Sequence, residues 1–327
     1  MKSIKKTLGI VLTAAAVVTA GSIFVSVAGN HYSDKIRIKM AHNQSKDSEI
    51  ADCIAKVAKF AAEDPSMNME IDIYPSGVLG TEQSAVEMVK AGVLDMAKVS
   101  SSMLGQFNDC YSIFSLPYLF TSEGHYYNAM EKSEKVRELF RMNEDEGFLV
   151  IGYYANGSRN IYLKEDIKAD SPAVLKGKKI RSMTSSTSMR MLELMGASPT
   201  PMAASETYTA LQQGVVDGAE NTELALTVDK HGEVAKSYTY TEHQYTPEVY
   251  IISTKTWNRL TEEQQNYLVE CLNRSNENFK NKYRQMMEEA IEEAKGMGMT
   301  IYYDIDKTAF IEAVQPLHEE YKAKGAF

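Results

Sequence analysis

The sequence predicts an α/β protein with two lobes, and three observations support this prediction. Along residues 35–98, apolar residues recur first with period two and then with helical spacing, which is the βαβ pattern of a mainly parallel sheet. A helix–glycine–strand arrangement at Gly92 recurs at Gly214. The chain has 327 residues, and the roughly 300 that follow an apolar N-terminal segment are more than one core usually holds.

Residues 1–29 have the pattern of an export signal. Lys2, Lys5 and Lys6 form a basic start, an apolar or small run extends to Gly29, and the small residues of 26–28 (SVA) suit a cleavage point. The run also reaches the roughly 20 residues that span a bilayer, so an uncleaved anchor is the alternative. In either case the remainder is expected outside the cytoplasm, in the periplasm or on the outer face of the cytoplasmic membrane.

The first half of the chain alternates strands and helices. Strands are predicted at 36–40 and 69–73, with a helix between them whose apolar residues, from Ile50 to Phe60, fall on one face. The next helix has Thr81 as its N-cap and ends at Gly92, because glycine readily takes the left-handed conformation that ends helices. A short strand at 94–99 follows.

The remaining elements continue this mixture of helices and strands. A charged surface helix is predicted at 131–142 and a buried strand at 148–154. Further elements are expected in the second half: a strand at 178–180, a helix at 205–213 that Gly214 stops, an extended segment at 215–217, a strand at 249–253, and a helical region at 261–294 with one break, ended by Gly296 and Gly298.

The two lobes are expected to share the chain unevenly. Residues 34–155 plus 246–285 are assigned to lobe I, and residues 156–245 plus 286–327 to lobe II. No Pro-rich or low-complexity linker separates them. Several chain crossings are therefore expected between the lobes, an arrangement that suits hinge closure around a ligand.

Composition and motifs exclude several classes of function. A net charge of −9 and a pI near 5.3 give no basic surface for nucleic acid. The odd set Cys53, Cys110 and Cys271 fits neither a disulfide framework nor a paired metal site, and Cys53 is expected to be a buried thiol, with one disulfide as the alternative. No catalytic motif, metal-ligand spacing or phosphate-binding glycine loop occurs, so neither an enzyme, a metal nor a cofactor is predicted.

Two arginines are candidates for binding an anion. Arg159 follows the predicted buried strand and the turn at 156–158, and Arg181 ends the short strand at 178–180. Ligands of open α/β sheets bind outside the carboxyl ends of the strands, so both guanidinium groups can reach one crevice. A planar guanidinium holds a carboxylate through two parallel hydrogen bonds, whereas lysine cannot. The alternative for each arginine is an ion pair with a surface Asp or Glu.

Asn221 follows the second helix–glycine–strand unit. Its amide both donates and accepts hydrogen bonds, which suits a ligand with a carboxylate beside hydroxyl groups. The alternative is an asparagine that forms a turn through its own backbone.

Three longer segments resemble the dicarboxylate- and sugar-acid-binding family of solute-binding proteins from tripartite ATP-independent periplasmic (TRAP) transporters. They are residues 175–181 (LKGKKIR), 196–202 (GASPTPM) and 205–221 (SETYTALQQGVVDGAEN). Shorter matches at 79–80, 92–95 and 116–118 extend the similarity over nearly the whole mature chain. The resemblance implies a periplasmic-binding-protein-like fold, in which several segments cross between two α/β lobes and a long helix spans both.

The resemblance also implies roles for individual residues. Arg181 would make the main bidentate salt bridge to a ligand carboxylate, with Arg159 and Asn221 as auxiliary ligands. By position in the family pattern, further residues would face the cleft and meet hydroxyl groups: His42, Asn43, Glu82, Ser100 and His243.

These hydroxyl-binding groups favour a hexuronate, such as glucuronate or galacturonate, as the ligand, with succinate-like dicarboxylates as the alternative. The family also implies delivery to the membrane subunits of a TRAP transporter, and a monomer. Two other classes of function remain: a module that presents its ligand to a membrane sensor, and a secreted enzyme acting on acidic sugars, for which no catalytic constellation was found.

Overall fold

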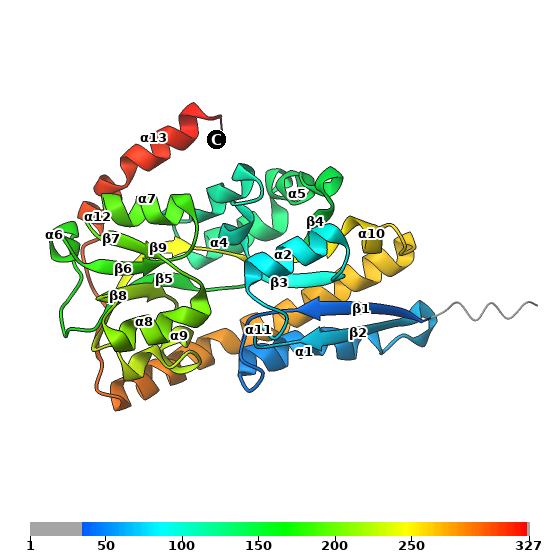
Figure 1. Cartoon of the computed structure of the whole chain (residues 1–327), viewed down its shortest axis with the longest axis horizontal. Coiled ribbons are helices and arrows are strands. Elements are labelled where there is room, and N and C mark those ends of the chain that lie inside the picture. The colour runs from blue at the N-terminus through cyan, green and yellow to red at the C-terminus, as the bar shows by residue number, and fades with distance from the viewer. Residues whose placement is uncertain (1–34, 326–327) are drawn as a thin grey trace, which may run out of the picture. The chain divides into compact units, whose positions relative to one another are not determined.

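The computed structural model describes residues 35–325, and the predicted export segment, 1–29, lies outside them. These residues form two β-sheets with helices packed around them (Figure 1). The α/β class predicted from the sequence is therefore confirmed.

The first sheet contains the strands of the predicted βαβ region. Strands β1 and β2 are parallel, β1 and β3 are parallel, and β10 runs antiparallel between β3 and β4. In spatial order the strands are β2 (Met69–Tyr74), β1 (Ile36–Ala41), β3 (Met96–Ser100), β10 (Glu248–Ser253) and β4 (Phe148–Tyr154).

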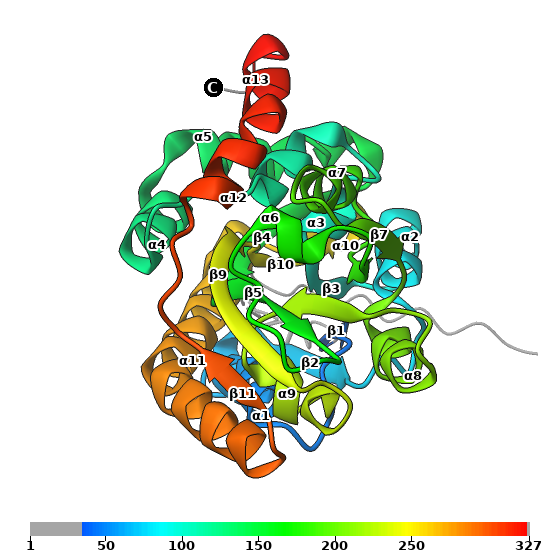
Figure 2. The same cartoon turned by 90° about the vertical axis from the view of Figure 1, so that its left-hand side faces the viewer.

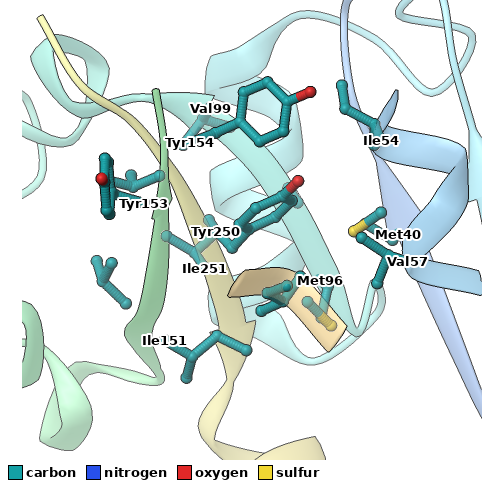
Figure 3. Packing of buried hydrophobic residues seen from close by; sticks show 14 of the residues in the cluster. Met40, Ile54, Val57, Met96, Val99, Ile151, Tyr153, Tyr154, Tyr250 and Ile251 are labelled. Carbon is teal, nitrogen blue, oxygen red and sulfur yellow. The ribbon is translucent and has the colours of Figure 1, made fainter. Parts of the chain in front are cut away.

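Apolar side chains hold this sheet to its helices. Met40 of β1 packs with Ile54 and Val57 of α1 (Glu49–Ala61), as Figure 3 shows. The rings of Tyr154 and Tyr250, from neighbouring strands, meet edge to face with 6.0 Å between their centroids. All five residues of β3 are buried, including the polar Lys98 and Ser100, and the strand lies in the interior of the sheet between β1 and β10.

The second sheet has mixed strand directions. Strand β5 is antiparallel to both of its neighbours, while β6 runs parallel to β7 and β8, and β11 parallel to β9. The long strand β9 curves between β11 and β5 (Figure 2). In spatial order the strands are β11 (Thr300–Tyr302), β9 (Ser237–Tyr245), β5 (Ser158–Leu163), β8 (Gly218–Asn221), β6 (Lys179–Ser182) and β7 (Ser198–Pro201).

Helices surround both sheets. No helix within residues 35–325 is long and apolar enough to cross a membrane. In addition to α1, the helices are α2 (Glu82–Ala91), α3 (Ser101–Leu104), α4 (Glu123–Lys132), α5 (Glu134–Arg141), α6 (Pro172–Leu175), α7 (Ser186–Leu194), α8 (Thr207–Gln213), α9 (Leu224–Thr227), α10 (Thr254–Trp257), α11 (Glu262–Gly296), α12 (Thr308–Ala313) and α13 (Gln315–Ala323).

Helix α11 is the long helix that the resemblance implies. It runs unbroken, so the predicted break is wrong, and it begins with a capping box in which the side chains of Thr261 and Gln264 each accept from the other's backbone N–H. Leu272 and Phe279 pack in the core of the first sheet, and Ile291 and Ala294 in a core of the second. One helix therefore stabilises both sheets (Figure 1).

The repeated helix–glycine–strand unit is real and extends to its aspartates. Gly92 ends α2 and Gly214 ends α8, each with φ of +72°. Asp95 Oδ2 accepts the backbone N–H of Lys39 at 2.9 Å, and Asp217 Oδ2 accepts that of Lys179 at 2.7 Å. In both units the aspartate therefore ties the turn to the backbone of a neighbouring strand, at Lys39 within β1 and at Lys179 at the start of β6.

Three predicted boundaries need correction. The charged helix expected at 131–142 is two helices, because Ser133 leaves the helical conformation and caps α5 through its hydroxyl group. The segment 215–217 is not extended; the strand β8 begins one residue later. Helix α8 begins at Thr207 rather than 205, after a short 3₁₀ turn.

Three connections join the two sheets within the described residues: 155–157 between β4 and β5, 246–247 between β9 and β10, and α11. Several chain crossings were expected. The described residues, 35–325, also hold together as a single unit, so the exact lobe boundaries at 155/156, 245/246 and 285/286 stay a prediction.

Candidate ligand-binding site

A cavity of about 750 Å³ lies between the two sheets, which is within the range of roughly 300–1,000 Å³ usual for small-molecule sites. Its walls contain residues at the carboxyl ends of β3, β4, β6 and β8. Ligand sites of open α/β sheets form beyond the carboxyl ends of the strands, and this cavity has that position. Of the predicted site residues, the structure brings six to this cavity: Asn43, Glu82, Ser100, Arg159, Arg181 and Asn221.

Arg159 is held in a buried ion pair. Its Nε and Nη2 lie 2.5 and 3.0 Å from the two carboxylate oxygens of Glu220, which is fully buried. Although burial opposes ionisation, Arg159 and His243 lower the pKa of Glu220 to about 2. For Arg159, burial alone would lower the pKa, but the neighbouring Glu220 carboxylate outweighs burial, so the pKa of Arg159 is raised. The charge of Arg159 is therefore neutralised inside the protein.

Arg181 has no such partner. Its side chain is 5% exposed, its Nη2 donates to the backbone oxygen of Met202 at 2.9 Å, and its Nε has no hydrogen-bond partner. No carboxylate within residues 35–325 forms an ion pair with it. Burial without a paired carboxylate lowers the pKa of Arg181, yet a guanidinium stays charged. This arginine is therefore a cation at the cavity wall with unused donors.

Asn221 lies beside the buried ion pair. Its Oδ1 accepts hydrogen bonds from Arg159 Nη1 and from the backbone N–H of Thr222, both at 2.9 Å. These contacts orient the amide so that its nitrogen remains as a donor. The second contact reaches the backbone of the next residue and not, as in an Asx turn, the residue two positions on. The side chain thus has a local structural contact in addition to its place in the cavity wall.

The first sheet contributes a polar wall to the same cavity. Glu82, the first residue of α2, accepts hydrogen bonds from Asn43 Nδ2 at 3.1 Å and from the backbone N–H of Ser100 at 3.3 Å. Burial and the nearby Glu248 raise the pKa of Glu82 to about 7. Ser100 itself shares a hydroxyl contact of 2.8 Å with Ser102.

Two predicted site residues do not reach the cavity wall. His243 is fully buried behind Glu220, 3.5 Å from its carboxylate, and contacts Thr241 at 2.7 Å. His42 lines a separate space of about 10 Å³ together with Lys98. Burial, and then Lys98, lower the pKa of His42 to about 3, so it is a neutral imidazole at ordinary pH. His243 lies within β9 and His42 directly follows β1, and both side chains are buried in the interior behind the wall.

Several residues of the site were not recognised from the sequence. Lys98 is 1% exposed and its Nζ lies 2.7 Å from Glu248, and both line the cavity. Lys98 is the one charged residue of the buried strand β3, and this lone charge is a signal in the sequence that points to the site. Glu220, which neutralises Arg159, lies one residue before Asn221, but nothing in the sequence pairs it with a residue 61 positions away.

At one side of the cavity, helix α3 and the residues after it contact the segment that follows β6. The hydroxyl group of Ser102, in α3, lies 3.1 Å from the sulfur of Met183. The side-chain amide of Gln106 donates to the backbone oxygen of Thr184 at 2.6 Å. Met183 and Thr184 follow β6, two and three residues after Arg181. These contacts thus form next to the unpaired cation.

Within 35–325, no group of three or more His, Cys, Asp and Glu side chains could hold a metal ion. Cys53, Cys110 and Cys271 are all free thiols. Cys53 is buried in the first core, as expected, and the alternative of a disulfide is not met.

Comparison with known proteins gives consistent matches over nearly the whole chain. The family model for bacterial extracellular solute-binding proteins of family 7 (DctP) matches residues 40–324. The uncharacterized protein YiiZ of Salmonella typhimurium is 37% identical over 296 residues, which is 90% of this chain and 89% of that protein. The C4-dicarboxylate-binding periplasmic protein of Rhodobacter capsulatus is 26% identical over 312 residues, 93% of this chain and 92% of that protein.

Solved structures match equally well. A TRAP periplasmic solute-binding protein from Anaerococcus prevotii, with bound α/β-D-glucuronate, superposes with a TM-score of 0.84 at 34% identity, covering 89% of this chain and 94% of that one. One from Sulfitobacter, with bound β-D-galacturonate, gives 0.82 at 29% identity, covering 88% and 95%.

Proposed function

The chain belongs to the bacterial extracellular solute-binding proteins of family 7, and we propose that its ligand is a hexuronate, held by Arg181. The membership confirms the resemblance recognised in the sequence. As a member of this family, the protein acts outside the cytoplasm and delivers a small acid ligand to the membrane subunits of a TRAP transporter. The family is one of binding proteins rather than of enzymes, and we infer that the ligand leaves unchanged.

The state of Arg181 carries this proposal. It is a buried cation at the cavity wall without a carboxylate partner, and its Nε is unused. A buried charge without a partner is costly, and a ligand carboxylate would supply the missing charge and two parallel hydrogen bonds. The ligand therefore needs at least one carboxylate.

The opposite wall favours hydroxyl groups on the rest of the ligand. Asn43, Glu82 and Ser100 present amide, carboxylate and hydroxyl groups to the cavity. These are hydrogen-bonding partners for the ring hydroxyls of a sugar acid, and they have little to offer the methylene groups of a C4 dicarboxylate. Relatives with bound glucuronate and galacturonate support the same choice.

Binding would couple to closure between the two sheets. A ligand that contacts Arg181 on one side and Glu82 on the other stabilises the state in which both are close to it. Closure would exclude water and strengthen the charge-assisted bonds. The closed surface would then be the one that docks on the membrane subunits.

A thermal-shift screen of the mature protein tests the proposal, because a ligand that binds only the folded state raises the melting temperature. The panel contains D-glucuronate, D-galacturonate, D-gluconate, succinate, malate and glucose. We expect the largest shift with a hexuronate and none with glucose, which has no carboxylate. A larger shift with succinate or malate would replace the hexuronate by the dicarboxylate alternative, and no shift with any acid would refute the role of Arg181.

A further inference from the structure

The charged residues of the cavity wall are paired unequally. Among the described residues, the cations that line the cavity are Arg159, Arg181 and Lys98. Arg159 is neutralised by Glu220, and Lys98 by Glu248. Arg181 is therefore the one lining cation left to bind an anion.

A carboxylate lies on the wall across from that cation. Glu82 Oε1 is occupied by Asn43 and Ser100, and no hydrogen bond within residues 35–325 involves its Oε2. Glu82 is half-buried and lines the cavity, so Oε2 remains as an acceptor at the wall. Arg181 and Glu82 interact electrostatically across the cavity without forming an ion pair.

Lys98 attracts the charge of Glu82 but is already paired, so it is not free to bind a ligand anion. Its Nζ is 2.7 Å from Glu248, and its side chain is 1% exposed. Two further carboxylates, those of Glu206 and Asp229, also border the cavity. A ligand with a second negative charge would therefore find carboxylates and no free cation beyond Arg181.

We propose that the site admits one carboxylate per ligand and that Glu82 determines this selectivity, accepting hydroxyl hydrogens from a sugar monoacid and repelling the second carboxylate of an aldarate. The proposal rests on the hexuronate function proposed above and adds an excluded substrate class to it. In a six-carbon aldarate, whichever carboxylate binds Arg181, the other lies at the far end of the molecule, toward the Glu82 wall. Opposed like charges in a desolvated site weaken binding strongly.

The experiment compares three six-carbon acids by calorimetric titration at pH 8.5. D-Glucuronate is the cyclic monoacid, D-gluconate is an open-chain monoacid, and D-glucarate is gluconate with a second carboxylate. For the unchanged protein we expect glucarate to bind at least about tenfold more weakly than glucuronate. In Glu82→Gln the ratio of the glucarate to the glucuronate dissociation constant should shrink by at least about threefold. The repelling charge is gone, while the side-chain amide oxygen remains as an acceptor for a hydroxyl group. Glu87→Gln, an exposed change on the same helix, should leave the ratio unaltered.

A second measurement varies the pH. Because the pKa of Glu82 is about 7 and that of Asp229, which also lines the cavity, is about 6, the unchanged protein should discriminate less against glucarate at pH 6 than at pH 8.5, and Glu82→Gln should lose most of this difference. The other charged or titratable groups near Glu82 are Lys98, Glu248 and Arg181, and the buried His42. Both acids stay ionised over this range, since ordinary carboxyl groups titrate near pH 4.

The outcomes separate the two proposals. If the unchanged protein binds glucarate as tightly as glucuronate, the selectivity is refuted while the hexuronate function stands. If glucarate is rejected equally by the unchanged protein and Glu82→Gln, and equally at both pH values, the role of Glu82 is refuted. If no hexuronate binds, the proposed function fails first.

Discussion

The carboxylate of Glu220 accepts two hydrogen bonds from the guanidinium of Arg159, at 2.5 Å from Nε and 3.0 Å from Nη2. Both side chains are buried. Arg181 lies in the same cavity wall and has no carboxylate of its own. Two arginines that look alike in the sequence thus have different tasks: Arg159 is fixed within the protein, and Arg181 is left for the ligand.

Arg181→Lys should weaken hexuronate binding by about 10- to 100-fold although the charge is kept. An ammonium group cannot reproduce the planar pair of hydrogen bonds, and such charge-assisted bonds contribute roughly 1.5–3 kcal/mol. Isothermal titration measures the loss, and Arg190→Lys, on the exposed side of α7, is the matched control. Affinity within twofold of the unchanged protein would remove Arg181 from the binding role.

Glu220→Gln should destabilise the fold by about 3–5 kcal/mol, because it leaves Arg159 charged, buried and uncompensated. Urea unfolding at pH 7 measures the change. Glu165→Gln breaks an ion pair with Lys178 in which the carboxylate is 64% exposed, and little change is expected there. Equal effects of the two substitutions would mean that the buried pair is no more important than a surface pair.

His42 should make the protein less stable in acid. Its pKa is about 3 when folded and near 6.5 when unfolded, so its contribution is fully present above pH 6.5 and is lost as the pH falls toward 3. The slope is at most about 1.4 kcal/mol per pH unit for one group. Unfolding free energies of His42→Gln between pH 7 and pH 4 should fall less steeply than those of the unchanged protein. The exposed His125→Gln serves as control, and parallel curves for His42→Gln would contradict the assignment.

Gly157→Ala should destabilise the crossing between β4 and β5. A Cβ at this position would overlap the hydroxyl group of Tyr283 on α11, and such overpacking typically costs about 1–3 kcal/mol. Tyr283→Phe in the same chain should restore part of the loss in a urea-unfolding measurement, since the nearest overlapping atom is removed. Gly124→Ala, in α4 with no atom within 4 Å of the added Cβ, should be neutral or slightly stabilising. A neutral Gly157→Ala would show that the crossing can shift freely past α11.

The local elements follow largely from the sequence, because their causes are local. Period-two and helical apolar spacing located β1, α1 and β2, and the capping residues Thr81 and Gly92 located both ends of α2. The errors also have local causes. Ser133 caps a new helix within a charged run, and α11 is continuous although its sequence suggested a break, because packing against both sheets holds it straight.

The sequence by itself determined the α/β class, the repeated helix–glycine–strand unit, and the presence of two arginines at strand ends that suit a carboxylate. Only the tertiary structure decided which arginine is free, because Glu220 reaches Arg159 from a strand that lies far along the chain and beside it in the sheet. It likewise placed Lys98 and Glu248 in the wall and kept His42 and His243 behind it. Charge pairing and side-chain direction depend on contacts between distant segments, and no local pattern encodes them.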